Sequence, residues 1–233
     1  MGQTIQFQRP DGANVNGYLA EASHPVGSVA VIQEWWGLNG QIRGVADRLA
    51  GAGFTALVPD LYRGKSTVEA EEAHHLMAGL DFGDAAANDL RGAAAYLKAR
   101  SIGSGKVGVT GYCMGGALTV LSMMSVPEAD AAVIWYGVPP LEYVDASKIG
   151  SKRPIMAHWA TQDLAFPIAS VDAFEAKLRE ANVHYEGHRY LAHHAFANET
   201  AVGPGRIPIT QYDPVWAQLA WDRTMRFFGQ YLS

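Results

Sequence analysis

The sequence predicts an α/β domain: a mostly parallel central sheet with helices on both faces and a short antiparallel edge at the N-terminus. Two observations carry this prediction. Short apolar runs alternate along the chain with segments of helical periodicity, which is typical of parallel strands joined by helices. The first two strand-like segments instead alternate polar and apolar residues, as a half-exposed edge does. No linker or internal repeat interrupts the pattern, so we expect a single domain over residues 1–233.

The N-terminal edge is predicted from residues 4–7 and 15–19, which flank a turn at Pro10-Asp11-Gly12. Each segment alternates side chains in the way a strand with one buried face requires. A turn this short joins antiparallel neighbours. We therefore expect a hairpin at the start of the chain.

The remaining strands are predicted from apolar runs that suit strands buried on both faces. They lie at 29–32, 54–58, 107–109, 131–136, 154–158 and, last, 184–190. Helices are expected near 41–52, 83–100, from Met114 onward, 169–181 and 215–231. In sheets of this kind ligands bind beyond the carboxyl ends of the strands, so the functional residues are sought there.

Composition limits the function classes. The 233 residues, 48% hydrophobic and 18% charged, suffice for a full-sized core. The net charge of −5 is mild and no basic run occurs, so neither a nucleic-acid nor a membrane partner is expected. The single cysteine permits no internal disulfide, and the first residues lack a signal-peptide layout, which together favour a cytoplasmic protein. Nothing in the sequence determines the oligomeric state, although a monomer is plausible.

The most informative motif is Gly111-Tyr112-Cys113-Met114-Gly115-Gly116, which follows the apolar run at 107–109. It matches the G-x-S-x-G nucleophile elbow of α/β-hydrolases, with cysteine in the serine position. Such a turn is sharp, and its neighbours must be nearly free of side chains for strand and helix to approach. The following helix begins at the thiol, and the positive end of its dipole favours thiolate. Cys113 is thus the candidate nucleophile.

An acid is expected downstream of the nucleophile, because the order in these enzymes is nucleophile, acid, base. Asp163 follows the strand at 154–158 and suits this role, although an Asp before a helix is often only a turn or capping residue. Asp172 and Glu175 fall inside the next helix on a face expected to be solvated. Asp60 ends a strand but precedes the elbow, so it fits the order poorly.

The base is expected in the loop Leu191-Ala192-His193-His194-Ala195-Phe196, where either imidazole could serve. His158 is interpreted as an interior or strand-end histidine, and His74 and His75 lie in a polar stretch. A metal site using His184 and His188 is disfavoured because no acidic or cysteine ligand accompanies them at metal-ligand spacing. Gly64-Lys65-Ser66 lacks the earlier glycine of a phosphate loop. No metal or cofactor is expected.

Over nearly its whole length the chain resembles the dienelactone hydrolase (carboxymethylenebutenolidase) family. The resemblance rests on six motifs in the family's order: Gln33-Glu34-Trp35-Trp36-Gly37-Leu38-Asn39, Val58-Pro59-Asp60-Leu61-Tyr62, the elbow, Trp135-Tyr136-Gly137, Gln162-Asp163 and His194-Ala195-Phe196. The closing Trp221-Asp222-Arg223-Thr224 also fits. The resemblance implies the α/β-hydrolase fold.

The resemblance also implies site roles. It indicates a triad of Cys113, His194 and Asp163, with His194 preferred over His193 because it stands in the His-small-Phe pattern. It implies that Glu34 contacts the resting cysteine and helps to release its thiolate. The oxyanion hole would be the backbone N–H groups of Met114 and Trp35.

Substrate contacts are implied for Trp36, Tyr62, Arg63, Tyr136 and Arg206. Trp35 and Trp36 could equally be core aromatics. The family's two carboxylate-binding arginine positions align with Gly64 and Asn198. A dienelactone substrate then requires Arg63, one residue out of register, or Arg206, on the later loop Gly203-Pro204-Gly205-Arg206, to reach the site.

The expected function is therefore opening of a lactone or ester by thiol acyl transfer, dienelactone-type hydrolysis giving maleylacetate being the leading case. Its partner is a small-molecule ester or lactone. One alternative is hydrolysis of other small esters, including neutral ones, by the same triad. A less favoured alternative is a non-hydrolytic ligand-binding or redox-sensing protein that uses Cys113 as a switch.

Overall fold

The central feature of the fold is a twisted sheet. The computed structural model describes residues 2–203 and 206–233, and within them the strand order is β1-β2-β4-β3-β5-β6-β7-β8. The strands are β1 (Gln3–Gln8), β2 (Asn14–Ala20), β3 (Gly27–Ile32), β4 (Phe54–Pro59), β5 (Val107–Tyr112), β6 (Ala131–Trp135), β7 (Ile155–Ala160) and β8 (Tyr185–Tyr190). β1 pairs antiparallel with β2, and β2 pairs antiparallel with β4. The pairs from β4 through β8 are parallel, which confirms the predicted sheet.

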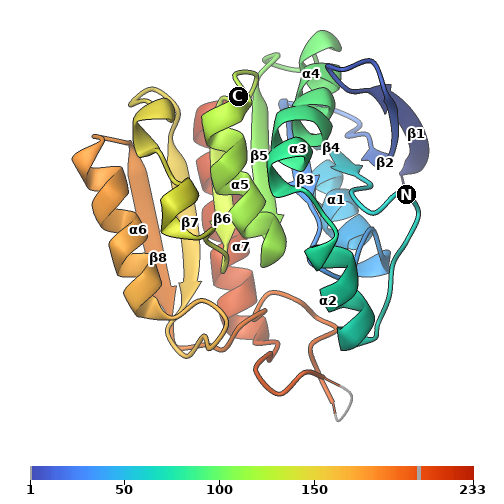
Figure 1. Ribbon diagram of the computed structural model, residues 1–233. Helices are drawn as coiled ribbons and strands as arrows, with labels where there is room; N and C mark the ends of the chain where they lie inside the picture. The colour runs from blue at the N-terminus through green and yellow to red at the C-terminus, as the bar shows by residue number, and fades with distance from the viewer. Residues whose placement is uncertain (1, 204–205) are drawn as a thin grey trace.

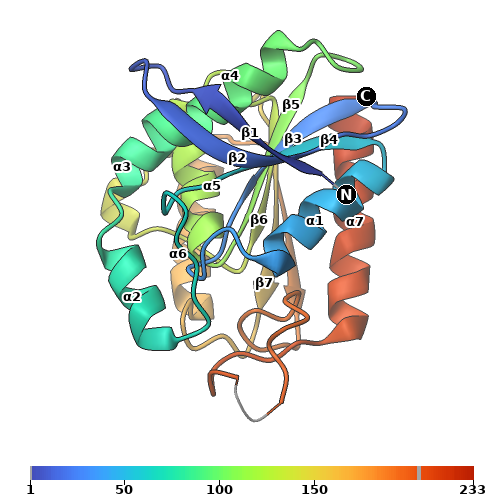
Figure 2. The same ribbon diagram turned by 90° about the vertical axis from the view of Figure 1, so that its right-hand side faces the viewer.

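Helices cover both faces of the sheet, as Figure 2 shows with the sheet seen nearly along its plane. On one face lie α1 (Gly40–Gly51) and α7 (Pro214–Leu232), and on the other α4 (Arg91–Ala99), α5 (Met114–Ser125) and α6 (Ile168–Glu180). β3 to β7 are buried along their whole length, as their unbroken apolar runs predict. The exposed residues of β8 fit its place at the sheet's edge.

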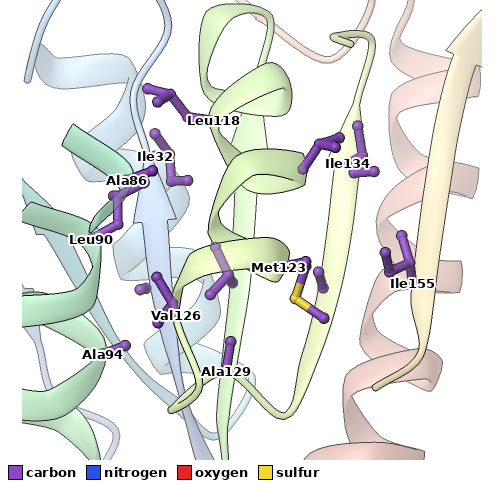
Figure 3. Close-up of a cluster of buried hydrophobic side chains, with 14 of the residues drawn as sticks. Ile32, Ala86, Leu90, Ala94, Leu118, Met123, Val126, Ala129, Ile134 and Ile155 are labelled. Carbon is purple, nitrogen blue, oxygen red and sulfur yellow. The ribbon is translucent and has the colours of Figure 1, made fainter. Parts of the chain in front are cut away.

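Two layers of core side chains hold these faces together. The layer between the sheet and α4 and α5 includes Ile32, Leu90, Leu118 and Ile134, all at most 1% exposed (Figure 3). The opposite layer packs β-strand residues against α1 and α7 through side chains such as Phe228. Burying one such side chain contributes about 2 kcal/mol, so the sheet is a rigid base for the loops at its carboxyl edge.

Capping side chains define where two helices begin. The Asn39 side chain accepts a hydrogen bond from the N–H of Ile42 at the start of α1. Asp213 does the same for Val215 and Trp216, and Pro214 occupies the first position of α7. Each cap follows a loop that carries candidate site residues, and it fixes the residue at which that loop ends and its helix begins.

The region between β4 and β5 departs from the prediction. The expected continuous helix at 83–100 consists of α3 (Phe82–Asp84), a π-helix (Ala85–Leu90) and α4. Helix α2 (Ala70–Ala78) was not predicted, because only Ala73 of its residues is fully buried and its apolar periodicity is weak. Short 3₁₀ turns at Leu141–Tyr143 and Ala146–Lys148 were also not predicted. Helices α2 and α3 stand beside α5 (Figure 1).

Candidate active site

Cys113 lies between the last residue of β5 and the first residue of α5, in a backbone conformation with φ of +55°. This left-handed conformation costs a non-glycine residue about 1–2 kcal/mol, and it persists only where packing enforces it. A Cβ on Gly111 would lie 2.1 Å from the carbonyl oxygen of Gly115, and one on Gly115 would lie 2.6 Å from that of Gln33. The prediction that the elbow requires glycines on both sides is thereby confirmed.

Gly137 supports the elbow from the next strand, a role that was not predicted. A Cβ at this position would lie 1.9 Å from the carbonyl oxygen of Cys113. The N–H of Cys113 also donates to the carbonyl of Trp135, at 3.0 Å. The end of β6 therefore holds the turn from one side.

His194 and Asp163 lie together at the carboxyl edge of the sheet. The Nδ1 of His194 and the Oδ2 of Asp163 are 2.8 Å apart, and both residues are buried. The other Asp163 oxygen accepts hydrogen bonds of 2.8 Å from the N–H groups of Ala165 and Phe166, which fixes the carboxylate. The His194 ring lies between the rings of Tyr136 and Phe166, with centroid separations of 5.3 and 5.5 Å.

The electrostatics of His194 favour its protonated form. Burial of the ring by itself lowers the pKa of His194. The interactions with Cys113 and with the Asp163 carboxylate raise it by more than burial lowers it, so the pKa stands well above the usual value for histidine. An imidazole that is readily protonated beside a thiol suits proton transfer between the two. Cys113, His194 and Asp163 are thus brought together by three separate loops.

Glu34 is a buried carboxylate at the end of β3, 3% exposed. Burial raises its pKa, and the charge of His194 and the hydrogen bonds from Asn198 and Tyr136 partly oppose that rise. Asn198 Nδ2 donates to its Oε2 at 2.6 Å, and the Tyr136 hydroxyl to its Oε1 at 3.3 Å. These are the two hydrogen bonds of the Glu34 side chain within the described residues, and the contact with Cys113 that the resemblance implies stays a prediction.

The orientation of the Asn198 amide follows from its other contacts. Its Oδ1 accepts hydrogen bonds from the N–H and the hydroxyl of Thr200, at 2.9 and 2.6 Å. A backbone N–H is always a donor, so the oxygen must face Thr200 and the NH₂ must face Glu34. Asn198, noted in the sequence only because it stands where an arginine was expected, is therefore the neutral partner of Glu34.

The residues weighed against these candidates have other surroundings. Asp172 and Glu175 of α6 both pair with Arg189 of β8. The predicted solvated face is wrong for Glu175, whose side chain is only 16% exposed because it also accepts a hydrogen bond from the Tyr185 hydroxyl. Asp60 accepts hydrogen bonds from the N–H groups of Tyr62 and Gly64 and so shapes a turn. It is His194, and not His193, that bonds to Asp163.

His158 is an interior histidine, as predicted. It is wholly buried between Tyr190 and Thr224, 2.8 Å from the hydroxyl oxygen of each. The Thr224 hydroxyl donates to the carbonyl of Ala220, so it accepts from Nε2–H, and Nδ1 accepts from Tyr190. Burial lowers the pKa of His158 well below its usual value.

The two arginines considered as substrate-carboxylate ligands are engaged elsewhere. Arg63 Nη2 donates to both carboxylate oxygens of Asp89, at 2.9 Å each, and Nη1 donates to the carbonyl of Asp60. Arg206 donates to the backbone carbonyls of Ile207, Pro208 and Thr210. Residues 204–205 of its predicted loop lie outside the described part of the chain. Neither arginine lines the cavity beside Met114.

The aromatic residues named as substrate contacts are divided between two places. The Tyr62 hydroxyl lies 3.2 Å from the Met114 sulfur, and burial raises its pKa. Trp35 packs against the core layer under α5, while Trp36 lines a small pocket of about 170 Å³ together with Arg206 and Asn198. Tyr136 is buried and its hydroxyl contacts the Glu34 carboxylate.

A larger cavity of about 730 Å³ opens beside Met114. Its described lining comes from α2, α3, α5, the loop after β6, and the loop that carries Asp163: Met77, Asp81, Phe82, Gly83, Met114, Ala117, Leu121, Val138, Pro139, Pro140, Tyr143 and Phe166. The sequence signal for part of this lining was helical spacing. Met114, Ala117 and Leu121 stand three and seven residues apart and so share one face of the helix that follows the elbow. The contribution of α2 and α3 carried no comparable signal.

The described residues give no sign of a metal centre, since no group of three or more candidate ligands is gathered among residues 2–203 and 206–233. Within the same part of the chain, no helix combines the length and apolar character needed to cross a bilayer.

The sheet order, the helices on both faces and the elbow at Cys113 define an α/β-hydrolase. A profile of the dienelactone hydrolase family matches residues 15–232, and the chain belongs to that family. Membership places it among the carboxylic ester hydrolases.

Individual relatives agree with this assignment. The chain is 35% identical to the protein usf of Aquifex pyrophilus, over all of both chains. It is 32% identical to carboxymethylenebutenolidase 1 of Cupriavidus pinatubonensis, over 68% of this chain and 71% of that one. A solved dienelactone hydrolase-like promiscuous phosphotriesterase from metagenomic libraries shares the fold, with a TM-score of 0.85, 23% identity, and coverage of 100% of this chain and 99% of that one.

Proposed function

We propose that this protein hydrolyses an ester or lactone through a covalent thioester on Cys113. The observation that supports the proposal most is the hydrogen bond between His194 and a buried Asp163, beside a cysteine held at positive φ. A nucleophile, a base and a group that orients the base are the three parts that nucleophilic acyl transfer needs.

In the first half of the proposed reaction, the Cys113 thiolate attacks the substrate carbonyl carbon and the carbonyl π electrons move to oxygen. The N–H groups of Met114 and Trp35 are the proposed donors to this oxyanion. Met114 is the first residue of α5, where helical N–H groups have no acceptor within the helix. The intermediate collapses by breaking the bond to the leaving oxygen, which takes the proton that His194 holds.

In the second half, His194 removes a proton from water as the water oxygen attacks the thioester. Loss of the thiolate releases the carboxylic acid and restores Cys113. Glu34 is proposed to assist by its charge, because a carboxylate near the ring stabilises the imidazolium formed at each step. In a lactone, the leaving oxygen remains attached to the acyl group.

Dienelactone is the substrate that the family suggests, and the product would be maleylacetate. The site supports the general reaction better than this particular substrate, because Arg63 and Arg206 are bound to protein oxygens. We therefore propose ester or lactone hydrolysis as the function, with dienelactone and a neutral aryl ester as the two substrates to compare.

The test uses the only cysteine in the chain, which makes thiol chemistry specific to one residue. Cys113→Ala is expected to lower turnover of cis- and trans-dienelactone and of 4-nitrophenyl acetate by about 10³-fold or more, with an unchanged circular dichroism spectrum. In the wild type, intact-mass measurement after rapid quenching should show an added acyl group, and one equivalent of iodoacetamide should abolish both signals. Undiminished hydrolysis by the alanine variant would disprove the mechanism.

A further inference from the structure

The cavity beside Met114 has the size and chemistry of a binding site for an apolar group. Its volume of about 730 Å³ lies within the range of about 300–1,000 Å³ for small-molecule sites. Three side chains of α5, beginning with Met114 directly after Cys113, form one wall, and Phe82 of α3 and Val138 after β6 contribute to the others.

Phe166 connects this cavity to the reacting groups. Its N–H donates to the Asp163 carboxylate, and its ring lies 5.5 Å from that of His194. The same side chain lines the cavity. A group bound there is consequently held between Met114 on one side and the loop of Asp163 on the other.

The cavity lining carries a negative charge and no positive one among its described residues. Asp81 is the only charged residue among the described residues that line the cavity. Its Oδ1 accepts a hydrogen bond of 2.9 Å from the N–H of Asp84, so it caps α3 and stays in place. Arg63 is not part of this lining, and its guanidinium is paired with the buried Asp89.

We infer that this cavity selects uncharged esters or lactones with an apolar alkyl or aryl portion, and that it discriminates against substrates with a carboxylate in that portion. The inference rests on the proposed function, since the apolar portion would be held against Met114, the residue that follows Cys113. Burial of each additional methylene favours the longer substrate, whereas a carboxylate would lose its hydration facing Asp81.

The experiment compares two substrates of equal length, 4-nitrophenyl pentanoate and mono-4-nitrophenyl glutarate, which differ by a terminal methyl or carboxylate. 4-Nitrophenyl acetate is the short reference, and the rate with Cys113→Ala is subtracted to remove spontaneous hydrolysis. We expect kcat/KM for the pentanoate to exceed that for the glutarate by at least about tenfold, and to exceed that for the acetate. The cavity could instead hold the alcohol portion of the ester. A second series of acetate esters with alkyl alcohols of increasing length, measured by release of acid, tests this arrangement.

Two variants test whether the cavity produces the selectivity. Leu121→Arg places a cation in the lining and should lower the pentanoate-to-glutarate ratio by about tenfold or more. Val215→Arg adds the same charge at a position that is 69% exposed and outside the cavity, and should leave the ratio unchanged.

The outcomes separate the two proposals. Cysteine-dependent turnover that is equal for the pentanoate and the glutarate, or faster for the glutarate, would overturn the cavity assignment and leave the thioester mechanism standing. A ratio that responds equally to both arginine variants would also overturn it. If no ester in any series is cleaved in a Cys113-dependent manner, the proposed function itself fails and the inference with it.

Discussion

Asn198 shows how a single residue adjusts a buried carboxylate. It donates one hydrogen bond to Glu34 but carries no charge, so the nearby positive charge that lowers the pKa of Glu34 is that of His194. Glu34 and His194 are consequently coupled, each favouring the charged form of the other. Asn198 acts through Glu34 and is a positioning residue.

Asn198→Asp should reveal this coupling. It would place a second carboxylate against Glu34, and repulsion between the two negative charges would raise the pKa of the pair. Near pH 6 the pair would share one proton, which restores a donor to Glu34 like the Asn198 amide. Toward pH 8 that proton would be lost and the two carboxylates would repel each other. We expect kcat/KM relative to wild type to fall about tenfold at pH 8 and to recover as the pH is lowered toward 6. Asn198→Ala, which removes the donor without adding charge, is the control and should give a smaller loss with little pH dependence. An equal loss at every pH for Asn198→Asp would indicate a structural role only.

Residue types and their order were sufficient to predict that Cys113, Asp163 and one histidine of the pair at 193–194 lie at one edge of the sheet, because each follows a strand that ends there. The choice of His194, and of the three residues as a triad, came from the resemblance to the family. The contact between Asn198 and Glu34 could not be predicted. The two residues are 164 positions apart, and no local pattern indicates that the loop after His194 returns to β3. The pairing of Arg63 with Asp89 was unpredictable for a similar reason, since Asp89 lies in a π-helix that periodicity did not reveal.

At the scale of elements, the elbow depends on the approach of β6 to the start of α5. Gly137→Ala should lower the free energy of unfolding by about 3 kcal/mol or more, because its Cβ would lie 1.9 Å from the Cys113 carbonyl oxygen and backbone would have to move. Gly44→Ala is the matched control. It lies within α1 with nothing within 4 Å of the new Cβ, and should stabilise the protein by about 0.5–1 kcal/mol. Urea denaturation of both variants measures the difference, and similar stabilities would contradict this account of the elbow.

The elements that sequence periodicity predicted are those that bury a continuous apolar face. All eight strands of the described chain were predicted, with differences of up to three residues at their ends. Helix α2 was not, because Ala73 is its only fully buried residue and Leu76 and Met77 reach the core only in part. The segment at 83–100 was predicted as helix without its π-helical turn, because such turns are rare and short and the helix continues on both sides of it.

For the whole molecule, His158 connects three elements of the C-terminal half: β7, which carries it, β8 through Tyr190, and α7 through Thr224. Because its pKa in the folded protein is lowered, the unfolded chain binds more protons below about pH 6.5. This histidine thus contributes stability that is lost as the pH falls through the unfolded pKa. His194 has a raised pKa and acts in the opposite sense, contributing stability that is lost as the pH rises.

The free energy of unfolding should therefore decrease from pH 7 to pH 5, by up to about 1.4 kcal/mol per pH unit from His158 alone. His158→Gln should lower stability at pH 7 and flatten this decrease. Chemical denaturation at several pH values measures both effects, and an identical slope in the variant would show that other groups cause the acid sensitivity.

The chain that follows His194 is bound back to itself before α7 begins. Gln211 donates to the carbonyl of His194, Tyr212 to that of Ala201, and Asp213 to that of Phe196. His194 is thereby fastened directly to the start of α7 by backbone hydrogen bonds at residues 211–213. Residues inserted between Ala201 and Thr210 would leave these three bonds intact, so an engineer could graft a substrate-recognising peptide there without moving His194.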